Sequence, residues 1–255
     1  MAGKLLITMI FLLAAGCDLP QEPGRMPTSL TATEFEPGHN VFGMLRLDGR
    51  PGSSFIRVER AWETEETDDE FDSVIRDAGV TVIGDSGSWQ FEFTADSSDG
   101  DNYYHPDFMP QAGCTYDLIV ESPGLPTLTG KTTVPYPPLL TAADILIGAN
   151  SVTLTIPAEP TIILYDIYLL SAADQLARRV VSNGQAVTVA IDPDKLNGPA
   201  QRLLIYGYDA NLAAYQTTPT TIKPQTYHES TITVNGGYGC FGAVAVTEII
   251  LQEVN

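Results

Sequence analysis

Short apolar segments separated by turn residues run through the chain from Val41 onward, and they constrain its fold more than any other feature. Ile56 and Val58, for example, alternate with charged residues, which is the period of a half-buried strand. The segments 48–52 and 84–87 are rich in Gly, Asp, Pro and Ser, which are typical turn residues. Strand candidates that alternate with turns at this spacing predict an all-β sandwich.

The same pattern predicts the individual elements. The first half is expected to hold strands at 41–47, 54–62, 78–83, 89–94, 115–122 and 127–134, with a loop from 95 to 113. The second half is expected to hold strands at 151–156, 162–171, 186–191, 202–209, 230–234 and 243–252, with helical turns at 172–179 and 192–196. The glycines of 236–242 indicate a tight bulge or turn, and no long amphipathic helix is expected.

The N-terminus predicts export. Lys4 gives a positive start, and an apolar run follows to Gly16, with small residues before Cys17. The run Leu13-Ala14-Ala15-Gly16-Cys17 resembles the lipobox of bacterial lipoproteins. That resemblance implies that residues 1–16 are a cleaved signal peptide and that the Cys17 thiol receives a diacylglycerol. A non-lipidated signal or a membrane helix stays open as the alternative, although the run is short for a bilayer span.

The net charge limits the kinds of partner that the chain can bind, and the cysteine content limits the disulfides that it can form. The formal net charge of −19 repels phosphate backbones and anionic lipids. We therefore expect no nucleic-acid partner, and we expect membrane attachment through acyl chains on Cys17. Cys114 and Cys240 are the remaining cysteines, and in an exported protein they form either a disulfide or two separate buried thiols.

Several phrases in the sequence resemble one family, and most of them are turn phrases. They are Val41-Phe42-Gly43-Met44-Leu45, Phe55-Ile56-Arg57-Val58, Asp77-Ala78-Gly79-Val80-Thr81-Val82, the segments 110–118 and 130–135, and Gly236-Gly237-Tyr238-Gly239-Cys240-Phe241-Gly242-Ala243. The chain is similar to the Bacteroidota-type lipoprotein family filed as domain of unknown function four-two-four-nine. The resemblance implies an exported lipoprotein with an immunoglobulin-like N-terminal β domain, often beside TonB-dependent receptors. It implies no catalytic residues.

The expected domain organisation combines these observations. Three prolines in the segment 135–138 mark a boundary, because proline resists both helices and strand ladders. We expect a signal peptide at 1–16, a lipidated Cys and flexible tether at 17–38, a β-sandwich at 39–135 and a second β domain at 136–255. The segment 77–82 also resembles regulatory domains of carboxypeptidases, and two segments of the second half, 165–168 and 205–209, resemble fibronectin type III strands.

Two segments could suggest enzyme chemistry or a metal site. Gly84-Asp85-Ser86-Gly87 matches the residues around a trypsin-like serine, but His39 lacks the matching histidine motif, so a turn is preferred. The acidic segments 63–72 and 96–101 predict solvated loops, with a weak Ca²⁺ site as the alternative if they converge. We therefore expect no catalytic residues, no cofactor-binding residues and no metal ligands, apart from that weak calcium alternative.

The favoured function is a non-enzymatic, lipid-anchored interaction or binding module of the cell envelope. The outer membrane is the expected location, on its surface or on its periplasmic face, and the partner is an envelope protein or a glycan. The alternative is a calcium-assisted carbohydrate-binding module that uses the aromatic segment 103–108. A hydrolase that uses Ser86 or paired carboxylates is the remote alternative.

Overall fold

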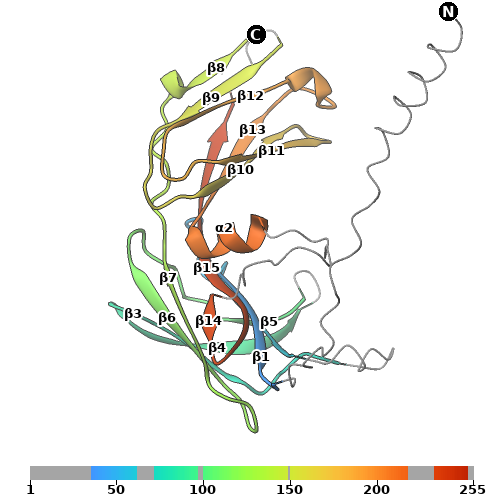
Figure 1. Cartoon of the computed structure of the whole chain (residues 1–255). Coiled ribbons are helices and arrows are strands. Elements are labelled where there is room, and N and C mark those ends of the chain that lie inside the picture. The colour runs from blue at the N-terminus through green and yellow to red at the C-terminus, as the bar shows by residue number, and fades with distance from the viewer. Residues whose placement is uncertain (1–35, 62–71, 97–99, 149, 218–232, 252–255) are drawn as a thin grey trace, which may run out of the picture. The chain divides into compact units, whose positions relative to one another are not determined.

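The computed structural model describes residues 36–61, 72–96, 100–148, 150–217 and 233–251. Almost all regular structure in these residues is β-strand (Figure 1). The predicted all-β sandwich is therefore confirmed. The predicted signal peptide, Cys17 and most of the tether lie outside the described residues.

The first sandwich contains the strands that precede residue 135. They are β1 (His39–Leu47), β2 (Phe55–Arg60), β3 (Gly79–Gly84), β4 (Gly87–Asp96), β5 (Gly100–Tyr104), β6 (Thr115–Glu121) and β7 (Leu128–Thr133). The long strand β4 pairs with β5 at one end and with β3 at the other. Val41, Ile56 and Tyr103 from β1, β2 and β5 share a core with Val82 and Leu118 from β3 and β6. Successive side chains of a strand point to opposite faces, so these apolar residues, which alternate with more exposed ones, bury one face of each strand.

The second sandwich has its own core. Its strands are β8 (Ile145–Ile147), β9 (Val152–Ile156), β10 (Leu164–Leu170), β11 (Gln175–Val181), β12 (Val187–Ile191) and β13 (Arg202–Tyr208), with 3-10 turns η1 (Ala142–Asp144) and η2 (Pro193–Lys195). A three-stranded sheet, ordered β12-β9-β8, contributes Leu154 and Ile156 to this core. Strands β10 and β13 contribute Ile167 and Ile205.

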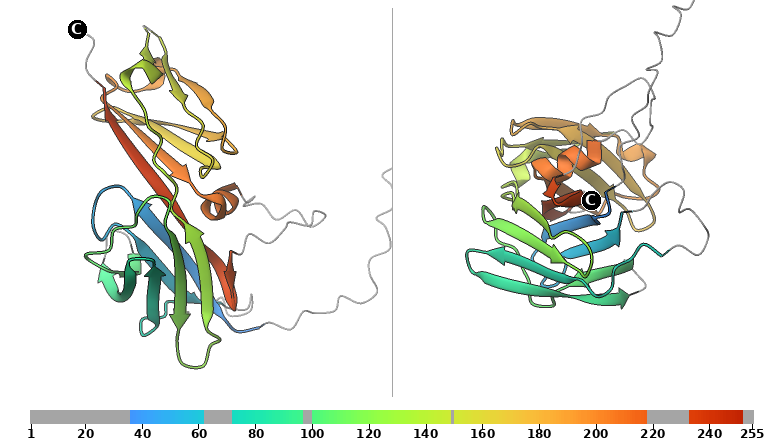
Figure 2. Two further views of the ribbon diagram at one scale, coloured as in Figure 1. Left: turned by 90° about the vertical axis from the view of Figure 1, so that its left-hand side faces the viewer. Right: turned by 60° about the horizontal axis from the view of Figure 1, so that its bottom comes forward.

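One long strand, β15 (Gly237–Ile250), belongs to both sandwiches (Figure 2). Its first part runs parallel to β1, from Gly237 to Ala245, and its second part pairs antiparallel with β13. The short strand β14 (Val234–Asn235) pairs with β7. The division at 135/136 stays a prediction, and the final strand contributes residues to the cores on both sides of it.

A short helix, α2 (Ala210–Thr217), packs on this shared strand β15 (Figure 1). Leu212 and Ala213 are buried there with Cys240 and Val244. Gly242 permits this contact, because a Cβ at that position would meet the Leu212 side chain at 2.6 Å. The helix was not expected from the sequence, since its apolar residues make only a short, weakly patterned stretch.

Three local expectations were wrong. Strand β5 lies in the segment expected to be a loop, and strand β11 replaces helical turns expected at 172–179. The Ala, Leu and Arg residues of β11 are good helix formers, but full pairing with β10 overrides that local preference. Gly236 forms the expected bend between β14 and β15, but residues 237–242 begin β15 rather than forming a bulge, because the glycines let β1 approach closely.

Candidate functional site

Four aromatic side chains lie in a row on the outer face of the sheet that contains β1, β2 and β5. Phe42, Phe55 and Tyr104 come from these strands, and Tyr215 comes from α2. Neighbouring ring centroids are 5.1 Å apart for Tyr215 and Phe42, 5.9 Å for Phe42 and Phe55, and 6.3 Å for Phe55 and Tyr104. We call these four residues the aromatic row.

Strand alternation explains why the aromatic row faces outward. Val41, Ile56 and Tyr103 occupy the neighbouring positions in the same strands and are buried in the first core. The rings of the row are therefore on the opposite face, where Phe42, Phe55 and Tyr104 are half-buried and Tyr215 is 44% exposed. Partly exposed aromatic rings that lie side by side are a common basis for ligand binding.

A pocket of about 380 Å³ lies at one end of the aromatic row, and polar side chains contribute to its wall. Its lining residues are Asn40, Val41, Phe42, Arg57, Glu59, Tyr215 and Gly239. The register of β1 and β2 places Phe42 opposite Arg57 and Asn40 opposite Glu59. Phe42 and the polar groups therefore meet at neighbouring positions of one strand pair, and Tyr215 lines the pocket from α2.

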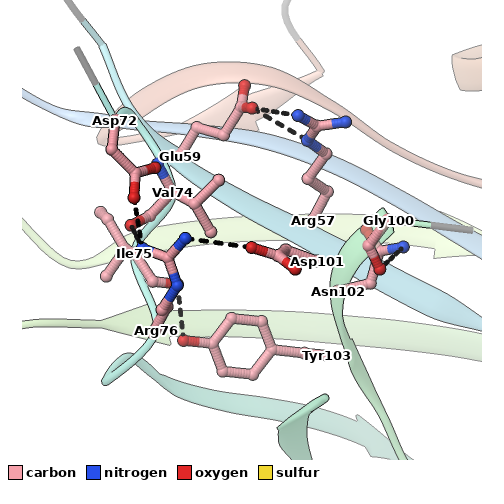
Figure 3. Close-up of polar contacts among 10 residues, drawn as sticks. All are labelled: Arg57, Glu59, Asp72, Val74, Ile75, Arg76, Gly100, Asp101, Asn102 and Tyr103. Atoms are coloured by element: carbon pink, nitrogen blue, oxygen red, sulfur yellow. Dashed lines mark hydrogen bonds and ion pairs between the residues drawn. The ribbon is translucent and has the colours of Figure 1, made fainter. Parts of the chain in front are cut away.

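An ion pair forms part of this pocket wall (Figure 3). The Nε and Nη2 atoms of Arg57 both donate to the Oε1 atom of Glu59, at 2.9 and 2.6 Å. Among the described residues, the Oε2 atom of Glu59 and the Nη1 atom of Arg57 have no further hydrogen-bond partner. These two atoms are therefore available to a ligand.

A second polar cluster joins Asp72 and Asp101, the last residues of the two acidic segments, through Arg76 (Figure 3). Arg76 binds Asp72 through Nη1 at 2.6 Å and Asp101 through Nη2 at 3.1 Å. The hydrogen bond from Arg76 lowers the pKa of the Asp72 carboxyl below its usual range. The guanidinium also lies 5.9 Å from the centroid of the Phe93 ring. The ends of the two segments are thus held together by a cation that belongs to the protein.

The predicted calcium site is only partly covered by the structure. Asp72 and Asp101 already share Arg76, and within the residues described no group of three His, Cys, Asp or Glu side chains could hold a metal ion. Residues 63–71 and 97–99 lie outside the described residues. Calcium binding stays a prediction.

A buried carboxylate lies at the start of α2. The Oδ1 atom of Asp209 accepts a hydrogen bond from the Leu212 backbone N–H at 2.8 Å, and Oδ2 accepts one from the Thr132 hydroxyl. Asn211 donates to the carbonyls of Lys131 and Phe241, each at 2.8 Å. Burial raises the pKa of Asp209 to about 6. Because both carboxylate oxygens are already bonded, this group joins β7 to α2.

The other residues named from the sequence are not brought together. Cys114 and Cys240 are free thiols; their Sγ atoms lie near the Gln111 Oε1 atom at 3.8 Å and the Asn211 carbonyl at 3.6 Å. The disulfide that the sequence left open is therefore not formed. Burial raises the pKa of Cys240 to about 11. Cys17 lies outside the described residues.

Ser86 and His39 occupy separate structural positions. Ser86 is exposed in the turn between β3 and β4, as the turn interpretation predicted. His39 is buried; its Nδ1 donates to the Pro126 carbonyl at 2.9 Å, and its Nε2 accepts from the Ser122 hydroxyl at 2.6 Å. Burial lowers the pKa of His39. Both ring nitrogens therefore serve the packing of β1 against the β6–β7 turn.

The aromatic segment 103–108 is divided between the core and the surface. Tyr103 and Phe108 are buried in the first core, while Tyr104 belongs to the aromatic row. Sequence reasoning missed the other members of the row. Strand alternation could have identified Phe42 and Phe55 as outward-facing, because they neighbour Val41 and Ile56. The sequence holds no comparable signal for Tyr215, since its position depends on how α2 packs.

By its fold the chain is an all-β sandwich protein with two main hydrophobic cores. It belongs to the family described as Domain of unknown function (DUF4249), which matches residues 41–179, more than half of the chain. The predicted family is thereby confirmed.

A two fibronectin type-III domain segment from chicken tenascin is similar at 12% sequence identity, with a TM-score of 0.25. That alignment covers 85% of this chain and 98% of the tenascin chain. No curated protein matches the chain. None of the helices in the described residues is long and apolar enough to cross a membrane.

Proposed function

We propose that the chain is an exported, lipid-anchored, non-enzymatic binding module of the cell envelope. The observation that carries the binding role is the aromatic row, which offers side-by-side rings on an outer sheet face. The bonds already made by His39 and Asp209 give these residues structural roles, which supports a binding role over a catalytic one. The module acts beside a TonB-dependent transport system at the outer membrane.

The anchor in this proposal is a lipid on Cys17. A net charge of −19 would repel anionic head groups, so buried acyl chains would have to supply the membrane affinity. Metabolic labelling with palmitate in a producing bacterium tests this. We expect label in the wild type and none in Cys17→Ala; equal labelling of both proteins contradicts the anchor.

The binding role is tested by capture of a partner from envelope membranes. The bait is the chain from residue 18 onward, and Phe55→Ala removes a central ring of the aromatic row. Tyr136→Ala is the matched control, because Tyr136 is 51% exposed and is not part of the row. We expect Phe55→Ala to reduce capture and Tyr136→Ala to leave it unchanged. If neither substitution changes capture, the aromatic row is not the binding site.

A second candidate is the calcium-assisted carbohydrate-binding module, which the same aromatic row favours. Against the calcium requirement, Asp72 and Asp101 are already neutralised by Arg76. Calorimetric titration with Ca²⁺ tests the requirement. We expect no binding heat from the full chain. Saturable binding of Ca²⁺ would instead support the calcium-assisted function.

A further inference from the structure

We infer that the pocket at the end of the aromatic row binds a neutral glycan and that it does so without a metal ion. This inference rests on the proposed binding function and names its ligand class. Five residues carry it. They are Phe42 and Tyr215, which supply rings, and Asn40, Arg57 and Glu59, which supply polar groups.

The rings match the apolar face of a sugar. A pyranose ring presents C–H groups on its faces, and these carry a small positive charge. The face of an aromatic ring is electrostatically negative, so C–H groups pack on it favourably. Phe42 and Tyr215 have centroids 5.1 Å apart and planes tilted by 40°, and Tyr215 is 44% exposed. The pair therefore forms a shallow surface on which one sugar ring can rest.

The polar groups match the hydroxyl rim of the same sugar. The Oε2 atom of Glu59 can accept a hydrogen bond, and the Nη1 group of Arg57 can donate one. Asn40 adds an amide that can both donate and accept. The ion pair between Arg57 and Glu59 holds both side chains in place before a ligand arrives, which lowers the entropy cost of binding.

The charges in the pocket favour a neutral ligand. The positive charge of Arg57 is already neutralised by Glu59 at 2.6 Å. The whole chain carries a net charge of −19, which disfavours the approach of an acidic glycan.

The composition of the wall also favours a glycan over a protein partner. A protein partner of this pocket would have to cover the charged pair, and burying charges without full compensation is costly. A sugar instead satisfies the charged groups with its hydroxyls while its C–H face covers the rings.

Calorimetry with a defined panel tests this inference. The probes are neutral hexasaccharides built from glucose, mannose, galactose or xylose, titrated in EDTA into the chain from residue 18 onward. We expect at least one probe to bind. Tyr215→Ala should weaken that binding by about tenfold, since one aromatic contact is worth roughly that factor. Glu59→Gln should weaken it as well, and Tyr136→Ala should leave it unchanged.

Folding is monitored independently by thermal unfolding. Phe42 also packs beside the core under α2, so Phe42→Ala could perturb the fold. Phe42→Trp keeps an aromatic face there and should retain binding. The titrations are repeated with Ca²⁺ in place of EDTA, and binding that appears only with Ca²⁺ contradicts the metal-free assignment.

The other outcomes separate the inference from the proposed function. If none of the probes binds, the neutral-glycan assignment is wrong. If a protein captured from envelope membranes is then lost in Tyr215→Ala, the binding function stands with a protein partner. If no protein is captured either, both the neutral-glycan assignment and the proposed binding function are wrong.

Discussion

At the scale of single residues, Asp209 combines a buried carboxylate with a raised pKa. Its carboxylate caps α2 through Leu212 and accepts from Thr132, yet burial raises its pKa to about 6. Desolvation disfavours the charged form, and the hydrogen bonds offset that cost in part. The native state therefore holds a proton at Asp209 more tightly than the unfolded chain, in which an Asp has its ordinary pKa of about 3.8.

The shift gives a pH-dependent stability with a definite sign. Between about pH 4 and pH 6 the native state binds more protons at this position, so its contribution to stability is lost as the pH rises. Asp209→Asn removes this titration. From pH 4.5 to pH 7.5, we expect the wild type to lose about 2 kcal/mol of unfolding free energy relative to the variant.

Urea unfolding at the two pH values measures this difference. Asp144→Asn is the control, because hydrogen bonds from Thr141 lower the pKa of Asp144 below its ordinary value. Asp144 therefore stays ionised at both pH values, and its replacement should leave the difference between them as in the wild type. If Asp209→Asn follows the pH profile of the wild type, Asp209 does not titrate as inferred.

At the scale of elements, the parallel pairing of β1 and β15 depends on glycines, and Gly239 makes the tightest contact. Gly239 has a φ of +104°, a conformation that side chains rarely adopt. A Cβ at this position would also overlap the carbonyl oxygen of Val41 on β1. The backbone of β15 thus approaches β1 in a way that only a residue without a side chain permits.

Gly239→Ala should therefore separate β1 from β15. We expect the free energy of unfolding to fall by more than about 2 kcal/mol, since the clash adds to the conformational strain. Gly124→Ala is the matched control. Gly124 also has a positive φ, of 81°, but a Cβ there would meet no atom within 4 Å. Chemical denaturation of both variants is the measurement, and equal losses would mean that strain alone decides the effect.

At the scale of the whole molecule, β15 links the two sandwiches into one compact unit that spans residues 37–255. Its N-terminal part pairs with β1 and its C-terminal part pairs with β13. If β15 detaches from one sandwich, core residues of the other sandwich also become exposed. We therefore expect the two sandwiches to unfold together.

A substitution in the second core tests this coupling. Leu203 is fully buried there, and Leu203→Ala should cost about 2 to 5 kcal/mol. Both tryptophans of the chain, Trp62 and Trp89, precede residue 135, and Trp89 packs against the first core. Tryptophan fluorescence should therefore shift to the same lower midpoint as circular dichroism. A fluorescence midpoint that stays at the wild-type value would mean that the sandwiches unfold independently.

The sequence by itself determined the class of the fold and most of the strands. Alternation at Ile56 and Val58 and the turn at 84–87 depend on local chemistry, so they can be identified without knowing the fold. Strand β11 could not be identified in this way, because its residues favour a helix locally and only pairing with β10 makes them a strand.

Tertiary structure alone decided the site. Phe42, Arg57 and Tyr215 lie in three separate elements, and nothing in their spacing along the chain brings them together. Their meeting depends on the register of β1 with β2 and on the packing of α2 against Gly242 of β15. Local patterns specify which face of a strand is buried, whereas long-range pairing specifies which exposed side chains become neighbours.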